Sequence, residues 1–254
     1  LRQTHALDAH ADHIMLSLKD TTFHPVELGA RLRLSPDSIL AQASAGDLEL
    51  SVRSPHGLDS LNIYAQRLLQ EIHTETDSLR LDQEKLRQML PTLQVHLLCG
   101  TRNPINNLLR SAAGYTFDQL HLDLDSSPTD GLTGDGHIYT LNTGAILLDT
   151  IRWDITQDAE GVALRSSIKN GRRNRVASFR STLQARLTAT GATAHLDFID
   201  AKGKKGVDLG IEANMTPEGT RLHMTPLNPI IAYRRFTLNE DNYVELTREG
   251  RVLA

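Results

Sequence analysis

The sequence that decides the fold is ASFRSTLQARLTATGATAHLDFIDAKGKKGVDLGIEANMTPEGTRLHMT, residues 177–225. In its first part, apolar or small residues occupy every second position, and polar residues fill the positions between them. Phe179, Leu183 and Leu187 therefore fall on one side, and Arg180 and Gln184 fall on the other. Because successive side chains of a β-strand point to opposite faces, this pattern predicts a strand with one apolar face and one solvated face.

The same alternation resumes after each of three turn sequences, which are Gly191, the run 202–206 and Pro217-Glu218-Gly219. No period of 3.6 residues is present, so the whole stretch predicts an antiparallel meander without a helix. The large apolar residues that we expect to line its apolar face are Phe179, Leu183, Leu187, Leu196, Phe198, Leu209, Ile211 and Leu222.

Bulk properties narrow the classes of function. The net charge of −4 over 254 residues is modest and produces no electrostatic field strong enough to attract nucleic acid, so we expect no nucleic-acid partner. Cys99 is the only cysteine, which excludes an intrachain disulfide and leaves the compartment undecided. The chain starts at Leu1 and stops at Ala254 within an apparent strand, which suggests a piece of a longer protein.

The rest of the chain divides into three expected parts. In residues 1–56, apolar and polar residues alternate, which predicts further strands of the same sheet. Residues 57–114 form a helical insertion with helices expected at 58–72, 78–90 and 104–113. Residues 115–254 return to strands. In the first helix the apolar stripe consists of Leu61, Tyr64, Leu68 and Ile72, widened by Ala65 and Leu69. We therefore predict a mainly β fold, with one continuous sheet and a short helical insertion.

No catalytic or metal-binding motif emerges, and we expect neither an enzyme nor a cofactor. Asp8, His10 and Asp12 share one face of a strand, but same-face neighbours on one strand line up rather than converge on an ion. His121 and Asp123, together with Asp125, repeat that arrangement and are interpreted in the same way, as part of a solvated face.

The apolar face itself leaves two alternatives. It can be the covered core of a closed β-sandwich, such as an adhesin-like binding module, which is the commoner use of such a face. It can also be an open groove, because small residues such as Ser181 and Ala185 leave volume between the large ones. The three short helices are also too small to cover the whole apolar area that the alternating strands present. An acyl chain in such a groove is stabilised by roughly 0.8 kcal/mol per buried methylene.

One family resemblance adds to this pattern. The segment Asn228-Pro-Ile-Ile-Ala-Tyr-Arg-Arg-Phe-Thr-Leu-Asn-Glu-Asp-Asn-Tyr243 is its most specific part, supported by Leu148-Asp-Thr-Ile151 and Leu222-His-Met-Thr-Pro226. These residues resemble the TamB (translocation and assembly module) proteins of the Gram-negative envelope, relatives of the AsmA-like family. The resemblance covers about 115–254, and the first hundred residues match only in the style of their strands.

The resemblance implies a long meander curved into an open, taco-like groove in the periplasm, in a parent protein anchored in the inner membrane. It implies phospholipid acyl chains as ligands and an outer-membrane barrel of the Omp85 kind as a partner of regions outside this chain. It also implies a role in moving phospholipid toward the outer membrane and in outer-membrane protein assembly. The family has no catalytic residues to carry over.

Overall fold

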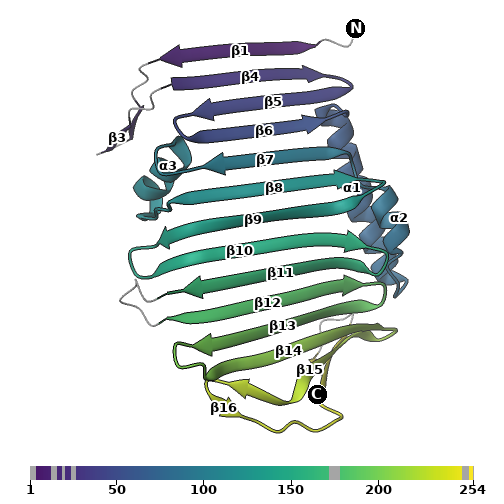
Figure 1. Ribbon diagram of the computed structural model, residues 1–254. Coiled ribbons are helices and arrows are strands. Elements are labelled where there is room, and N and C mark those ends of the chain that lie inside the picture. Colours follow the sequence, from purple (N-terminus) through teal and green to yellow (C-terminus); the bar gives the residue numbers. More distant parts are fainter. Residues whose placement is uncertain are drawn as a thin grey trace.

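The computed structural model describes residues 4–12, 16–18, 21–23, 27–171, 178–247 and 252–253. It consists mainly of one long, open antiparallel sheet, so the predicted fold class is confirmed (Figure 1). The first strands are β1 (His5–Asp12), β2 (Leu16–Leu18), β3 (Thr21–Phe23), β4 (Glu27–Ser35), β5 (Ser38–Ala45) and β6 (Leu48–Ser54). The helical part contains α1 (Leu58–Asp77), α2 (Gln83–Gln88), β7 (Leu93–Cys99) and α3 (Pro104–Ala113).

Strands make up the remainder of the described chain. They are β8 (Gln119–Ser127), β9 (Gly131–Asn142), β10 (Leu147–Asp158), β11 (Gly161–Asn170), β12 (Phe179–Thr188), β13 (Gly191–Asp200), β14 (Lys205–Thr216), β15 (Gly219–Ile231), β16 (Arg234–Arg235), β17 (Tyr243–Thr247) and β18 (Val252–Leu253). From β4 to β15 every strand pairs with its neighbours in sequence order, and β1 and β17 continue the sheet at either side. β2 and β3 form a separate hairpin.

The register keeps the apolar positions of all these strands on one side. One row of directly paired residues crosses twelve strands from β1 to β14. This central apolar row consists of Ala9, Ala30, Ala43, Leu50, Leu97, Leu122, Gly136, Trp153, Ser166, Leu183, Leu196 and Leu209. The side of the sheet that carries this row is the apolar face, and the opposite side is the polar face. A register error of one residue would exchange the two faces, so the row is a strong constraint on pairing.

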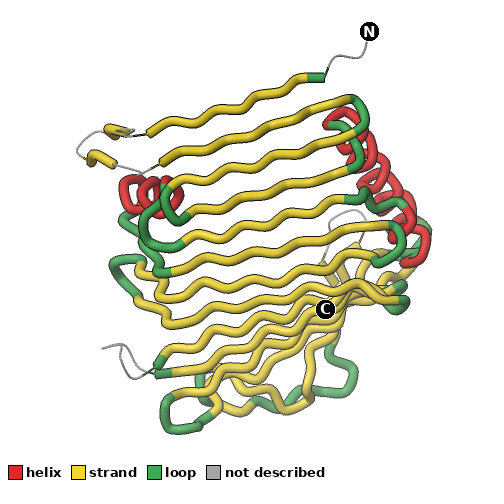
Figure 2. The backbone as a smooth tube through the Cα atoms, turned by 45° about the horizontal axis from the view of Figure 1, so that its top comes forward, coloured by secondary structure: helices red, strands yellow, loops and turns green. Residues whose placement is uncertain are grey.

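The sheet is curved rather than flat. Figure 2, turned by 45°, shows the C-terminal strands bending away from the plane of the first ones, with the helices on the inner side of the curve. α3 packs Ile105 and Leu109 against apolar-face residues, among them Ala45 and Leu48, which places the apolar face on that inner side. The fold is thus an open, curved sheet with its apolar face inward.

The helices occupy two opposite rims of the sheet (Figure 1). At one rim, α3 has the predicted bounds, with Asn103 as its N-cap and Gly114 at φ 71° as its C-cap. Around it, Ala45, Leu48, Cys99 and Phe117 form a small buried core. At the other rim, α1 and α2 run beside the ends of β6 to β12.

Several details of the expected helices are wrong. α1 runs on to Asp77 and does not end at 72. α2 is shorter than the expected 78–90, because Asp82 caps its start by accepting a hydrogen bond from the Lys85 backbone N–H at 3.0 Å. Leu79 lies in the left-handed region at φ 61°, which ends the preceding helix. The four residues of the apolar stripe of α1 are half-buried as predicted, but Ala65 and Leu69, expected to widen it, are both exposed.

The alternative of a closed sandwich is not found in the described part of the chain, where the sheet stays open. The second sheet there is only the two-stranded β2–β3 hairpin, and it leaves most of the apolar face uncovered. Ala177, the first residue of the expected strand, lies outside the described residues. No helix in the described chain is long and apolar enough to span a membrane.

Candidate functional site

All eight predicted groove residues lie on the apolar face, in the four consecutive strands β12 to β15. Leu183 pairs directly with Leu196, and Leu196 pairs with Leu209, so these three leucines lie side by side across three strands. The remaining members are Phe179, Leu187, Phe198, Ile211 and Leu222. The alternation pattern therefore brings together the residues that it selected.

These side chains remain accessible after folding. Leu187 and Leu196 are each 38% exposed and Ile211 is 43% exposed, although all three lie on the inner face of the sheet. The other five are half-buried, including Phe179 and Phe198, whose rings stack with centroids 5.3 Å apart. An apolar face in this state is an incomplete layer, because most sheets bury such a face against a second one.

Small residues separate the large ones on this face. Ala194 pairs with Ala185 on one side and with Ile211 on the other, and Ala192 pairs with Leu187 and Ala213. An alanine beside a longer side chain leaves a depression in the surface, because its methyl group fills little of the available space. The face can therefore accommodate flexible apolar groups between its leucines and phenylalanines.

The site extends beyond the residues that the sequence selected. Met224 pairs with Ile211 and is exposed, and Leu246 of β17 is exposed on the same face. Toward the N-terminus, Leu164 pairs with Ala185, and Trp153 lies in the central apolar row. Their alternation is visible in the sequence, but only the pairing register shows that they continue the same surface.

The α1–α2 pair reaches the site from one rim. The backbone N–H of Leu81 donates to the carbonyl oxygen of Ala189, in the β12–β13 turn, at 2.7 Å. The Arg87 guanidinium donates to the carbonyl oxygen of Thr129, in the β8–β9 turn, at 2.8 Å. These contacts fix the helices along the ends of the strands and leave the middle of the C-terminal half uncovered.

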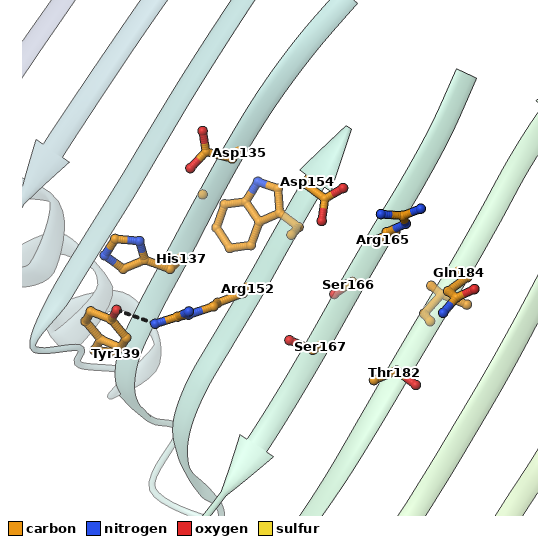
Figure 3. Close-up of a pocket in the computed structure, with 13 residues that line it drawn as sticks. Asp135, His137, Tyr139, Arg152, Asp154, Arg165, Ser166, Ser167, Thr182 and Gln184 are labelled. Carbon is orange, nitrogen blue, oxygen red and sulfur yellow. Dashed lines mark hydrogen bonds between the residues drawn. The ribbon is translucent and has the colours of Figure 1, made fainter. Parts of the chain in front are cut away.

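The polar face carries a different chemistry. A shallow hollow of about 570 Å³ lies over β9 to β12, lined by Asp135, His137, Tyr139, Arg152 and their neighbours (Figure 3). The Arg152 guanidinium donates to the Tyr139 hydroxyl at 2.9 Å. Burial lowers the pKa of His137, and the nearby His121 and Arg152 act in the same direction. This histidine is therefore neutral at neutral pH and is not a fixed positive charge.

Two groups of ionisable side chains stand out on the polar face. One group is His195, Asp197 and Asp208, and the Lys205 ammonium joins its two carboxylates, with Nζ 3.0 Å from Asp197 and 2.8 Å from Asp208. The hydrogen bond from Lys205 lowers the pKa of Asp208. The other group is His96, His121 and Asp123. Sequence reasoning missed His96, because it lies on a neighbouring strand and only the register of β7 against β8 brings it to Asp123.

Comparison with known proteins identifies no relative. No family model matches the chain, and no curated protein or solved structure matches it significantly. The resemblance to TamB proteins therefore stays a prediction, and the geometry of the two faces is the basis for assigning a function.

Proposed function

We propose that this chain is a periplasmic segment of a TamB-like bridge protein whose apolar face guides phospholipid acyl chains between the inner and outer membranes. In this proposal the parent protein is anchored in the inner membrane. An Omp85-type outer-membrane barrel binds regions of the parent outside this chain, and the parent supports outer-membrane assembly. The chain acts by binding and guiding lipid, and it performs no covalent step.

The observation that carries the proposal is the central apolar row. It contains only apolar or small side chains over twelve strands, with Ser166 as its one hydroxyl. At the usual spacing of strands it extends for about 50 Å. A compact binding site for one small ligand needs much less length, whereas a path for a moving ligand needs this continuity.

The dimensions of the face match an acyl chain. A phospholipid acyl chain is about 15 Å long, half the thickness of the hydrocarbon core of a bilayer. The apolar positions of β12 from Phe179 to Leu187 span about 27 Å at the usual rise per residue. An acyl chain therefore fits within the width of the face, with room for its polar headgroup at the rim.

The free energy of burial favours an acyl chain that occupies the apolar face but is not bound tightly. Each methylene that leaves water gains about 0.8 kcal/mol. Since the face is an open layer, an acyl chain on it keeps part of its surface in water and gains only a fraction of that amount. A ligand held in this way can exchange between neighbouring positions along the row, as a transport path requires.

The proposal can be tested by a substitution that places a charged side chain on the apolar face. In Leu183→Asp, we expect a folded protein that loses co-purifying phospholipid, because the carboxylate meets acyl chains in the middle of the path but stays hydrated when the face is empty. The matched control is Gln184→Asp, one residue further along β12 on the polar face, opposite Arg165 and His195. We expect this control to keep its lipid.

The measurements are extraction and mass spectrometry of phospholipid per chain, together with thermal unfolding. A Leu183→Asp protein that fails to fold, while Gln184→Asp folds, would indicate a buried core instead of a groove. A folded Leu183→Asp protein with the wild-type amount of lipid would remove Leu183 from the path. Wild-type chains without lipid that associate through this face would also contradict the proposal.

A further inference from the structure

The group on β7 and β8 of the polar face has the composition of a metal site. His121 and Asp123 are two residues apart on β8 and so point to the same side, and His96 of β7 is the direct partner of Asp123. One candidate ligand atom from each of the three lies within 4.8 Å of the others. The ligands therefore come from two strands, which allows them to converge on one point.

The Asp123 carboxylate already joins the two imidazoles. His96 Nδ1 lies 2.5 Å from one carboxylate oxygen, and His121 Nε2 lies 3.0 Å from the other. The His96 and His121 rings meet edge to face with centroids 5.7 Å apart. In such an arrangement a metal ion can replace the protons of the two hydrogen bonds, with small movements of the three side chains.

A further feature favours an ion. A hollow of about 300 Å³, lined by His96 and Asp123 with Arg53, Gln94 and Asp125, opens beside the group. It gives solvent, and hence water ligands, access to the open side of the site.

We propose that His96, His121 and Asp123 bind a divalent transition-metal ion of the Zn²⁺ type. Two imidazole nitrogens and one carboxylate oxygen are ligands that Zn²⁺ commonly takes, and water completes its coordination. Hard ions such as Ca²⁺ and Mg²⁺ prefer sites made of oxygen atoms alone. This site lies on the face opposite the proposed lipid path, so it does not depend on the proposed function.

The second ionisable group provides a comparison within the same molecule. His195 Nε2 lies 3.0 Å from Asp208, which resembles the first group, but the Lys205 ammonium already bridges Asp197 and Asp208 there. A metal ion would have to displace this lysine and meet its repulsion. We therefore assign the metal to the β7–β8 group alone.

The experiment is a titration of the full chain with Zn²⁺ after treatment with a chelator, followed by calorimetry. The wild type should bind one Zn²⁺ with a saturable isotherm. His96→Ala and His121→Ala should each weaken this binding by at least about 10-fold, the lower end of what even supporting residues of a metal site contribute. The matched control His195→Ala, on the same face and beside the lysine-bridged group, should bind as the wild type does.

Binding that is unchanged in both His96→Ala and His121→Ala would overturn the assignment, as would a wild type without saturable binding. If the variants do not fold, the imidazole resonances of the wild type provide a second measurement. Zn²⁺ should shift those of His96 and His121 first. A shift confined to other histidines would equally overturn the site.

Discussion

The two ends of the apolar face share the same alternation of apolar and polar residues, but a helix covers only the N-terminal end. Near β5 to β8, α3 lies over the face, and Cys99 and Phe117 are 0% and 3% exposed. Over β12 to β15 no described element lies on the middle of the face, and Leu196 keeps more than a third of its surface in water. Alternation in a sequence therefore predicts which side chains share a face, but not whether that face is buried.

The largest expected difference between the two ends is in stability. Phe117→Ala should lower the free energy of unfolding by about 3–5 kcal/mol, because it leaves a cavity in a fully packed cluster. Phe198→Ala should cost about half as much, because its ring is half-buried and already contacts water. Chemical denaturation of both variants measures the difference. Equal losses would mean that the C-terminal face is covered in solution.

A second difference should appear in thiol reactivity. Burial raises the pKa of Cys99 to about 11, from an ordinary 9.0, and the Asp47 carboxylate adds to the shift. The thiolate fraction at neutral pH is thus about 100-fold lower, before any protection by burial. In Leu196→Cys, the new thiol on the uncovered end should react with a maleimide at least 100-fold faster than Cys99 does.

The same labelling experiment can sharpen the comparison. Phospholipid vesicles added before the maleimide should slow the reaction at position 196 and leave the rate at Cys99 unchanged, if acyl chains occupy the face. The control is Gln184→Cys on the polar face, whose rate should not depend on lipid. Protection at position 184 as well would point to a general effect of the vesicles.

The smallest expected difference concerns pH. Burial alone would raise the pKa of Asp47, but hydrogen bonds from Asn103 and from the backbone N–H groups of Arg102 and Gly100 lower it overall. Since the folded pKa is depressed, this stabilisation is present above the unfolded value of about 3.9 and is lost as pH falls through the folded value. The wild type should therefore lose more thermal stability below about pH 4 than Asp47→Asn does.

Asp200 is the counterpart at the uncovered end. Its pKa is lowered chiefly by the backbone N–H of Lys204, and further by that of Lys202 in the same turn and by the hydroxyl of Tyr233, between β15 and β16. Asp47 instead joins the β5–β6 turn to the start of α3. Asp200→Asn should thus affect the β13–β14 turn and its contact with Tyr233 but not α3, and amide hydrogen exchange should separate the two cases. Equal exchange near α3 in both variants would contradict this reasoning.

Much of the fold follows from local chemistry. Turn residues and the period of two predict β12 to β15 and their order, and the Asn103-Pro104 start and Gly114 end of α3 are visible as capping signals. β5 is harder to recognise, because alanines at 41, 43 and 45 give weak strand signals. Its place follows from pairing on both sides with stronger strands.

The two candidate sites were not equally predictable. The apolar groove residues share single strands, so their common face can be derived from spacing alone. The pairing of His96 with Asp123 depends on the register between β7 and β8, which are separated by α3. The length of the intervening segment does not determine that register. Sites built across strands therefore needed the three-dimensional structure.

The meander also has a consequence for the order of assembly. Most strands pair with strands adjacent in sequence, so the sheet can grow one hairpin at a time and avoid the slow search for distant partners. The contact of Leu81 with Ala189 is an exception, because it joins segments separated by six strands. It can form only after β12 and β13 are in place. The contact between the helices and the β12–β13 turn thus forms late in folding. It couples strand pairs that could otherwise unfold independently, so that they unfold as one cooperative unit.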